Sequence, residues 1–129
     1  MTSPFRSWNG VAPHEIHPGV HLTAIGGEQV LLCRVTYDPG KTVPLHRHDD
    51  CEQVMAIVDG SVDMTIEGKR TTLVAGDVVV VNRGLDHELY SAGGVTFFEA
   101  LGPVPLDHVP DRERDLVLGP DNGAGHVER

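Results

Sequence analysis

Turn-forming residues recur along this chain at intervals of about ten residues, and this spacing restricts the possible folds more than any other feature. Fifteen glycines and nine prolines are scattered through the 129 residues and do not cluster. The runs between them are short and rich in Val, Leu and Ile, and none has the length and period of a long helix. The pattern predicts an all-β sandwich or barrel built from about nine short strands.

The strands expected from the apolar runs include 20–25, 29–38, 53–58, 61–67, 78–81, 85–91 and 95–101. Asp59-Gly60, between two of these runs, is a typical hairpin turn. Val78–Val81 is an uninterrupted β-branched run, which is typical of a strand covered on both faces. The sequence therefore predicts a fold of consecutive short strands and tight turns.

The length and charge of the chain restrict its organisation and partners. A chain of 129 residues is expected to form one domain. Its formal net charge of -9 argues against nucleic acid and against anionic membrane surfaces as partners. No apolar run reaches the roughly 18 residues of a membrane span, and the N-terminus lacks the apolar segment of a signal peptide. A cytoplasmic location is expected.

Two histidines two positions apart, His46 and His48, give the clearest chemical signal in the chain. In an extended segment alternate side chains point to the same face, so both imidazoles are directed at one place, as a metal ion requires. The carboxylate of Glu52 and the carboxamide of Gln53 follow after a short turn, and a third histidine, His87, lies further along.

The residues around this pair resemble the first sequence motif of the cupins. That motif is Gly, five residues, His-x-His, three or four residues, Glu, six residues, Gly. Gly40, His46, His48 and Gly60 occupy the corresponding positions, and Gln53 stands where the motif has Glu.

A second stretch resembles the other cupin motif, which is Gly, five residues, Pro-x-Gly, two residues, His, three residues, Asn. Gly76, Gly84 and His87 match it, whereas Asn82 and Ser91 replace the Pro and the final Asn. The resemblance covers about residues 20–101. It implies a single-domain jelly-roll β-barrel over 1–129, with an N-terminal arm (1–19), a C-terminal extension (102–129) with a flexible end, and a homodimer.

The resemblance also implies one divalent transition metal ion, Zn, Fe, Ni or Mn, held by His46, His48, His87 and the residue at position 53. Glu52 competes with Gln53 for the fourth place. Only Gln53 leaves the six residues before Gly60 that the motif requires. Because neighbouring residues of a strand face opposite sides, only one of the two can face the histidines. A neutral Gln ligand would leave the ion its full charge and make it a stronger Lewis acid.

Alternation extends the predicted site to a pocket. If Gln53 faces inward, Met55 and Ile57 do too, and Leu85 and Leu89 accompany His87. This lining fits a small apolar or aromatic substrate, and it also fits a plain barrel core.

Glu99 is the candidate catalytic residue, because it is a lone acid in the apolar strand VTFFEAL, on one face with Phe97. A buried acid is costly unless it is paired or functional, and burial raises its pKa into a range useful for acid–base catalysis. Two alternatives are that this face points outward or that Glu99 pairs with Arg34. Phe97 is also assigned to the pocket. Arg34, Tyr37 and Tyr90 are weaker candidates, and alternation along its strand places Tyr90 outward.

Three functions follow from the resemblance. The first is a metal-dependent cyclase, isomerase or lyase that performs non-redox carbonyl or enol chemistry, similar to cupin polyketide cyclases or sugar-linearising cupins. The segment after Glu99, Ala-Leu-Gly-Pro-Val-Pro, has no Arg or Lys to bind a uronate carboxylate. The second is an Fe(II)- or Ni-dependent dioxygenase, and the third is a non-catalytic metal- or ligand-binding cupin.

Overall fold

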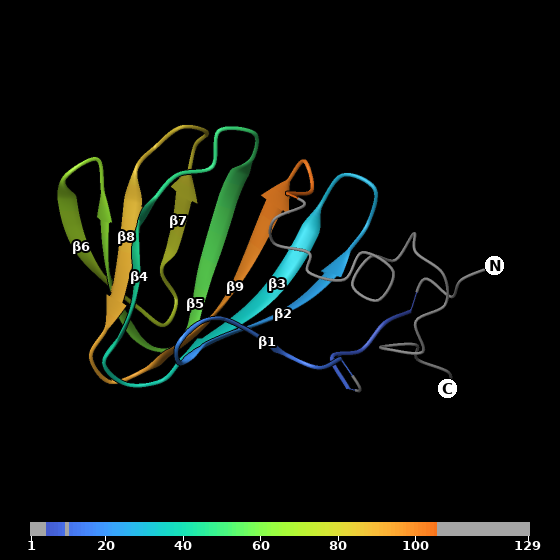
Figure 1. Ribbon diagram of the computed structural model, residues 1–129, viewed down its shortest axis with the longest axis horizontal. Coiled ribbons are helices and arrows are strands. Elements are labelled where there is room, and N and C mark those ends of the chain that lie inside the picture. The colour runs from blue at the N-terminus through green and yellow to red at the C-terminus, as the bar shows by residue number, and fades with distance from the viewer. Residues whose placement is uncertain (1–4, 10, 106–129) are drawn as a thin grey trace.

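The computed structural model describes residues 5–9 and 11–105 as one all-β domain, an antiparallel barrel that is nearly closed (Figure 1). This confirms the predicted fold class. The nine strands in this part of the chain are β1 (His14–His17), β2 (Val20–Gly26), β3 (Leu31–Tyr37), β4 (Lys41–His46), β5 (Glu52–Ile66), β6 (Lys69–Val74), β7 (Val78–Val81), β8 (His87–Ser91) and β9 (Val95–Gly102). The flexible end predicted for the C-terminal extension lies outside the described residues.

The strands form two half-barrels that share β5. The first half has the order β1-β2-β3-β9-β5-β7 and uses the start of β5, which Figure 1 shows between β7 and β9. The second half has the order β4-β8-β5-β6 and uses the end of β5, from Ser61 onward. One long strand therefore crosses from one side of the barrel to the other.

The hairpin predicted at Asp59-Gly60 is wrong, because β5 continues through these residues from Glu52 to Ile66. Gly60 has φ +77°, and the pairing with β9 shifts register between Ile57 and Asp59. A glycine with positive φ suits a bulge as well as a hairpin, and here it bends the strand. The nearby hairpin is at Glu67-Gly68, where φ is 47° and 80°, the signs that a type I′ turn needs.

The core lies between the two half-barrels and is made by alternate residues of the strands. In β2, β3 and β9 every second side chain is buried, and these strands face the buried residues of β5 and β8. The largest fully buried apolar side chains are those of Leu22, Leu31, Met55, Met64, Phe97 and Leu101. At about 25 cal/mol per Å² of apolar surface, their burial is the main term that stabilises the barrel.

The prediction that Val78–Val81 is covered on both faces is wrong. In β7 the side chains of Val78 and Val80 are 63% and 52% exposed, whereas Val81 is buried. The reason is that no described segment covers the outer face of this part of the sheet, because Val54, which lies opposite Val80 on the central strand β5, is also exposed at 37%. The described part of the chain contains no helix long and apolar enough to cross a membrane.

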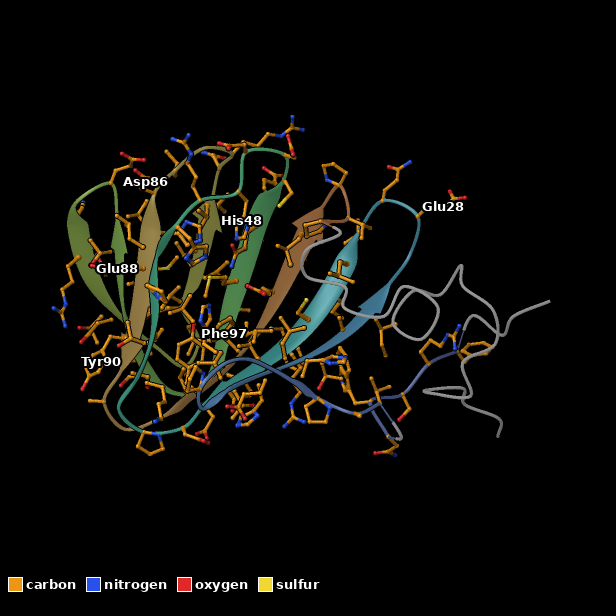
Figure 2. All side chains as sticks on the ribbon, viewed as in Figure 1. Glu28, His48, Asp86, Glu88, Tyr90 and Phe97 are labelled. Carbon is orange, nitrogen blue, oxygen red and sulfur yellow. The ribbon has the colours of Figure 1, made fainter. Side chains whose placement is uncertain are left out.

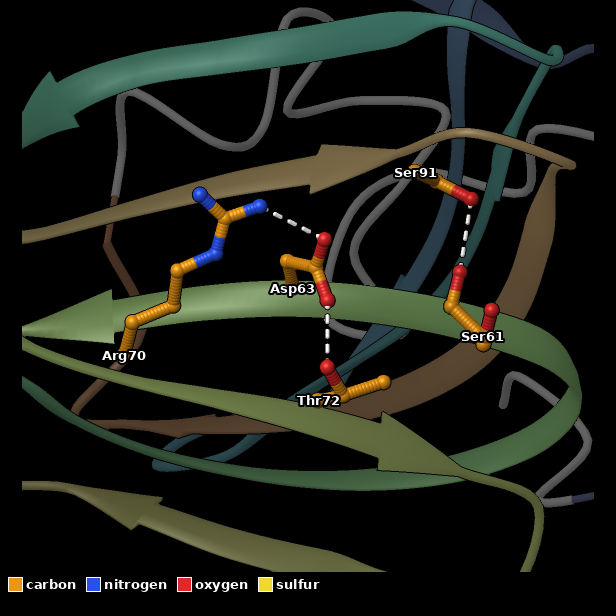
Figure 3. A network of polar contacts seen from close by, with 5 residues as sticks. All are labelled: Ser61, Asp63, Arg70, Thr72 and Ser91. Carbon is orange, nitrogen blue, oxygen red and sulfur yellow. Dashed lines mark hydrogen bonds and ion pairs between the residues drawn. The ribbon is translucent and has the colours of Figure 1, made fainter.

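A polar network on the second half-barrel ties β5 to its neighbours (Figure 3). Arg70 and Thr72 of β6 donate hydrogen bonds to the carboxylate of Asp63, at 2.7 and 2.6 Å. The hydrogen bond from Thr72 and then that from Arg70 lower the pKa of Asp63. On the other side, the buried Ser91 Oγ of β8 donates to the carbonyl of Ser61 at 2.6 Å. Ser91 thus connects the two strands from the position where the cupin motif has Asn.

Candidate metal centre

Pairing of β4 with β8 brings the three predicted histidines together. His46 lies directly opposite His87 in this pairing, and His48 follows two residues after His46, just beyond the end of β4. The ring centroids are 4.1 Å apart for His46 and His87, 5.1 Å for His46 and His48, and 5.4 Å for His48 and His87. One potential ligand nitrogen from each ring lies within 4.8 Å of the other two.

Backbone carbonyls select the tautomer of two of these rings. The Nδ1 atom of His46 is 2.7 Å from the carbonyl oxygen of Pro44, and that of His87 is 2.9 Å from the carbonyl oxygen of Leu85. A carbonyl oxygen only accepts hydrogen bonds, so each Nδ1 carries the proton and donates it. The lone pair is then on Nε2, which is the arrangement found in histidines that bind metals.

Gln53 and Glu52 lie on opposite faces of β5. Gln53 is 4% exposed and faces the interior, whereas Glu52 is exposed. The amide Nε2 of Gln53 donates a hydrogen bond to Oε2 of Glu99. Its Oε1 atom is buried and has no hydrogen-bond partner among the described residues. A buried oxygen of this kind is costly, and a metal ion in the cavity that Gln53 shares with His46 and His48 would satisfy it.

The donor set fits a divalent transition metal. Three imidazole nitrogens with one oxygen donor match the ligands used by Zn and by non-haem Fe or Ni. Tetrahedral ligands at ordinary zinc distances are about 3.4 Å apart, so rings whose nitrogens lie within 4.8 Å need only small rotations to bind one ion. The residues that can hold the ion are His46, His48, His87 and Gln53.

His46, His48 and Gln53 border a small cavity of about 30 Å³ inside the barrel. That volume holds an ion and one or two waters, because a single water needs about 10–15 Å³. The lining includes two predicted pocket residues, Leu89 and Phe97, and the predicted catalytic residue Glu99. The remaining lining residues are Ile16, Val35, Tyr37, Val43, His46, His48 and Gln53.

Sequence reasoning missed Ile16, Val35 and Val43 as lining residues. Val35 could have been found, because it alternates with Cys33 and Tyr37 on one face of β3, and all three are buried. Nothing in the sequence indicates that Ile16, on the short strand β1, reaches the cavity.

Glu99 faces the interior, so the alternative of an outward face is wrong. It is 5% exposed and lies opposite Cys33 in the pairing of β3 with β9. Arg34 lies opposite Phe98 on the outer face of the same two strands and is exposed. Arg34 therefore neither pairs with Glu99 nor lines the pocket, because adjacent residues of a strand point to opposite sides.

The other predicted pocket residues belong to the core. Met55 and Ile57 are 0% and 4% exposed and face inward as expected, but they do not line the small cavity. Leu85 is half-buried and packs against the core. The outward orientation expected for Tyr90 is confirmed, and Figure 2 shows it near the outer edge, whereas His48 and Phe97 lie among the interior side chains.

Tyr37 is a polar group of the cavity that the sequence indicated only weakly. Its ring packs against that of Phe97, with centroids 5.7 Å apart and an interplanar angle of 55°. Burial, and secondarily the nearby Glu99 carboxylate, raise the pKa of Tyr37 well above its usual value. The phenol therefore keeps its proton and remains a hydrogen-bond donor across the physiological pH range.

A larger hollow of about 550 Å³ adjoins the site at His48. It is lined by the segment between β4 and β5 and by residues after β9, namely Arg47, His48, Asp49, Asp50, Cys51, Val104 and Pro105. An ion pair of 3.1 Å joins Arg47 to Asp49 at this place. His48 therefore borders both the inner cavity and a space large enough for a small molecule.

Solved structures of the same fold include KdgF and a polyketide cyclase. KdgF from a Halomonas species superposes with a TM-score of 0.76 at 19% identity, over 81% of this chain and 99% of that one. The polyketide cyclase RemF from Streptomyces resistomycificus superposes with a TM-score of 0.70 at 15% identity, over 81% of each chain. At these identities the likeness establishes the fold alone.

The sequence itself has a curated relative, quercetin 2,3-dioxygenase of Bacillus subtilis, which is 33% identical over 48 residues. The match covers 37% of this chain and 14% of that enzyme, so it is a local one. The family model for the cupin domain matches residues 33–99, which is over half of the chain and contains all three histidines, Gln53 and Glu99. The barrel and the histidine triad agree with this match, and the chain belongs to the cupin domain family.

Proposed function

We propose that this cupin is a metal-dependent enzyme that performs non-redox carbonyl or enol chemistry, as a cyclase, isomerase or lyase. The observation that carries the proposal is the buried carbonyl oxygen of Gln53, which lines the same cavity as His46 and His48. It makes the fourth donor neutral, like the imidazoles. A divalent ion held by four neutral donors keeps its charge and would act as a Lewis acid on a carbonyl oxygen.

Two further side chains of the cavity are suited to the same chemistry. Tyr37, whose phenol keeps its proton, can donate a hydrogen bond to a substrate oxygen as negative charge develops there. Glu99 is the carboxylate in the lining and can accept or return a proton at a substrate carbon or oxygen. A donor and a proton acceptor in one cavity are what an enolisation needs.

The proposed substrate is a small apolar or aromatic carbonyl compound. Five of the ten lining residues are apolar, namely Ile16, Val35, Val43, Leu89 and Phe97. Because the inner cavity is only about 30 Å³, we infer that the reacting group enters it while the rest of the molecule occupies the larger hollow beside His48.

The test uses the purified protein, its metal content and a panel of aromatic and aliphatic β-ketones. We expect elemental analysis to find about one divalent ion per chain, and NMR in D₂O to show protein-dependent exchange or cyclisation at the carbon next to the carbonyl. His46→Ala should lose both the metal and the activity. His21→Ala is the matched control, because Nε2 of His21 lies 3.5 Å from a carboxylate oxygen of Asp38 and His21 is outside the triad. A His46→Ala protein that kept both properties would refute the site.

A dioxygenase is the second candidate, because the local sequence match is to quercetin 2,3-dioxygenase. Imidazole and amide ligands also suit Fe(II) and Ni(II), which can activate O₂. Oxygen-electrode measurements separate the two functions. Substrate-dependent O₂ uptake by the Fe(II) or Ni(II) protein would replace the first proposal, whereas turnover with Zn(II) under anaerobic conditions would support it.

A further inference from the structure

The pair formed by Gln53 and Glu99 bridges two adjacent strands inside the barrel. Gln53 lies opposite Leu101 and Glu99 lies opposite Met55, so the two side chains are diagonal neighbours on the inner face of β5 and β9. Both are almost fully buried, at 4% and 5% exposure. The hydrogen bond from Nε2 of Gln53 to Oε2 of Glu99 joins them directly.

This hydrogen bond decides which end of the amide faces the cavity. A carboxylate can only accept hydrogen bonds, so it attracts the NH₂ group of Gln53 and repels its oxygen. Turning the amide by half a turn would place two oxygens against each other in a buried environment, which is costly. The Oε1 atom of Gln53 therefore points away from Glu99, and it has no hydrogen-bond partner among the described residues.

We propose that Glu99 is a positioning residue for metal binding, which fixes the carbonyl oxygen of Gln53 as the fourth donor to the ion. The inference rests on the metal site proposed above and adds a role for Glu99 that does not require proton transfer. An amide has two ends of similar size, and only its oxygen binds a metal. Glu99 fixes which end of the Gln53 amide faces the ion. A carboxylate ligand at position 53 would not need such a partner, because both of its ends are oxygens.

Two substitutions at Glu99 separate positioning from charge. In Glu99→Gln the new amide can accept the hydrogen bond from Gln53 through its carbonyl, or turn and donate to Oε1 of Gln53. Even if the two arrangements were equally populated, the Zn²⁺ affinity would fall only about twofold, so it should stay within about threefold of the wild-type value. In Glu99→Ala the acceptor is lost, and the affinity should fall about 10- to 100-fold, as is typical when a partner of a metal ligand is removed. Zn²⁺ affinities are measured by competition with a chromophoric chelator, and the visible spectrum of the Co²⁺ protein reports any change in the donor set.

Val95→Ala is the matched control for loosening of the barrel. Val95 is a buried residue of the same strand, β9, and does not line the cavity. It should keep the wild-type Zn²⁺ affinity and Co²⁺ spectrum. Circular dichroism establishes that each variant is folded before its affinity is compared.

The outcomes are distinguishable from failure of the metal site itself. If the wild-type protein bound neither Zn²⁺ nor Co²⁺, the proposed function would fail first. If wild type binds and Glu99→Ala binds equally well with an unchanged Co²⁺ spectrum, the positioning role is wrong. If Glu99→Gln loses as much affinity as Glu99→Ala, the charge of Glu99 is what matters, and this also overturns the proposal.

Discussion

Replacing Gly60 by alanine should be one of the most damaging single-methyl changes in this barrel. A Cβ atom at Gly60 would lie 2.2 Å from the carbonyl oxygen of Gly94 and 3.0 Å from the Cα of Val95. Ordinary carbon–oxygen contacts are about 3.3–3.6 Å, so one strand must move by about 1 Å. The obstacle is backbone, which cannot rotate away as a side chain would.

The expected cost has two parts. The left-handed φ of +77° costs alanine about 1–2 kcal/mol, and forcing the neighbouring strand outward adds about 1–3 kcal/mol. Gly60→Ala should therefore lower the free energy of unfolding by about 2–5 kcal/mol, a large share of the 5–15 kcal/mol typical of a domain. Urea unfolding followed by circular dichroism measures this quantity.

Gly68 provides the matched control, because its φ is +80° but a Cβ atom there would meet nothing within 4 Å. Gly68→Ala should cost only the backbone strain, about 1–2 kcal/mol. The difference between the two variants isolates the contact with Gly94. If Gly60→Ala lost no more stability than Gly68→Ala, the close approach of β5 to the turn before β9 would not be present in solution.

Three other predictions concern the core, the surface network and the ion. Met55→Ala should lower the free energy of unfolding by about 2–5 kcal/mol, because Met55 is fully buried, and urea unfolding would show it. Asp63 has a lowered pKa in the folded protein, so its contribution to stability is present above the unfolded pKa of about 3.9 and is lost as the pH falls through the folded value. The stability advantage of wild type over Asp63→Asn, measured by urea unfolding at several pH values, should therefore shrink below about pH 4, and a constant difference would contradict the network. Excess chelator should lower the melting temperature of the wild-type protein and leave that of His48→Ala unchanged. If the metal had been present at 100 times its Kd, its removal should lower the free energy of unfolding of the wild-type protein by about 2.7 kcal/mol.

The sequence predicted the convergence of His46 and His48 from their spacing within one segment, whereas it predicted His87 through the second cupin motif. Residues two apart in an extended segment share a face, which is enough to direct His46 and His48 to one place. The same alternation separated Gln53 from Glu52 and placed Tyr90 outside. These inferences needed no knowledge of which strands are neighbours.

The wrong predictions depend on contacts between residues far apart in the sequence. Asp59-Gly60 has the same residues as a hairpin turn, and only the pairing of both ends of β5 with β8 and β9 shows that the strand continues. Val78 and Val80 are exposed because no described segment covers the outer face of their part of the sheet, which the composition of β7 alone does not indicate. The pairing of Arg34 with Glu99 failed because residues 33 and 99, rather than 34 and 99, lie opposite each other.

The hydrogen bonds of His46 and His87 to carbonyls two residues earlier imply that the coordinating nitrogen and the position of each ring are determined by different parts of the structure. Each hydrogen bond lies within one short segment, so the local backbone conformation determines which ring nitrogen can coordinate a metal. The meeting of the His46 and His87 rings, in contrast, depends on the pairing of the neighbouring strands β4 and β8. A change in how β4 and β8 pair would therefore alter the spacing of His46 and His87, while the coordinating nitrogen of each ring would stay the same.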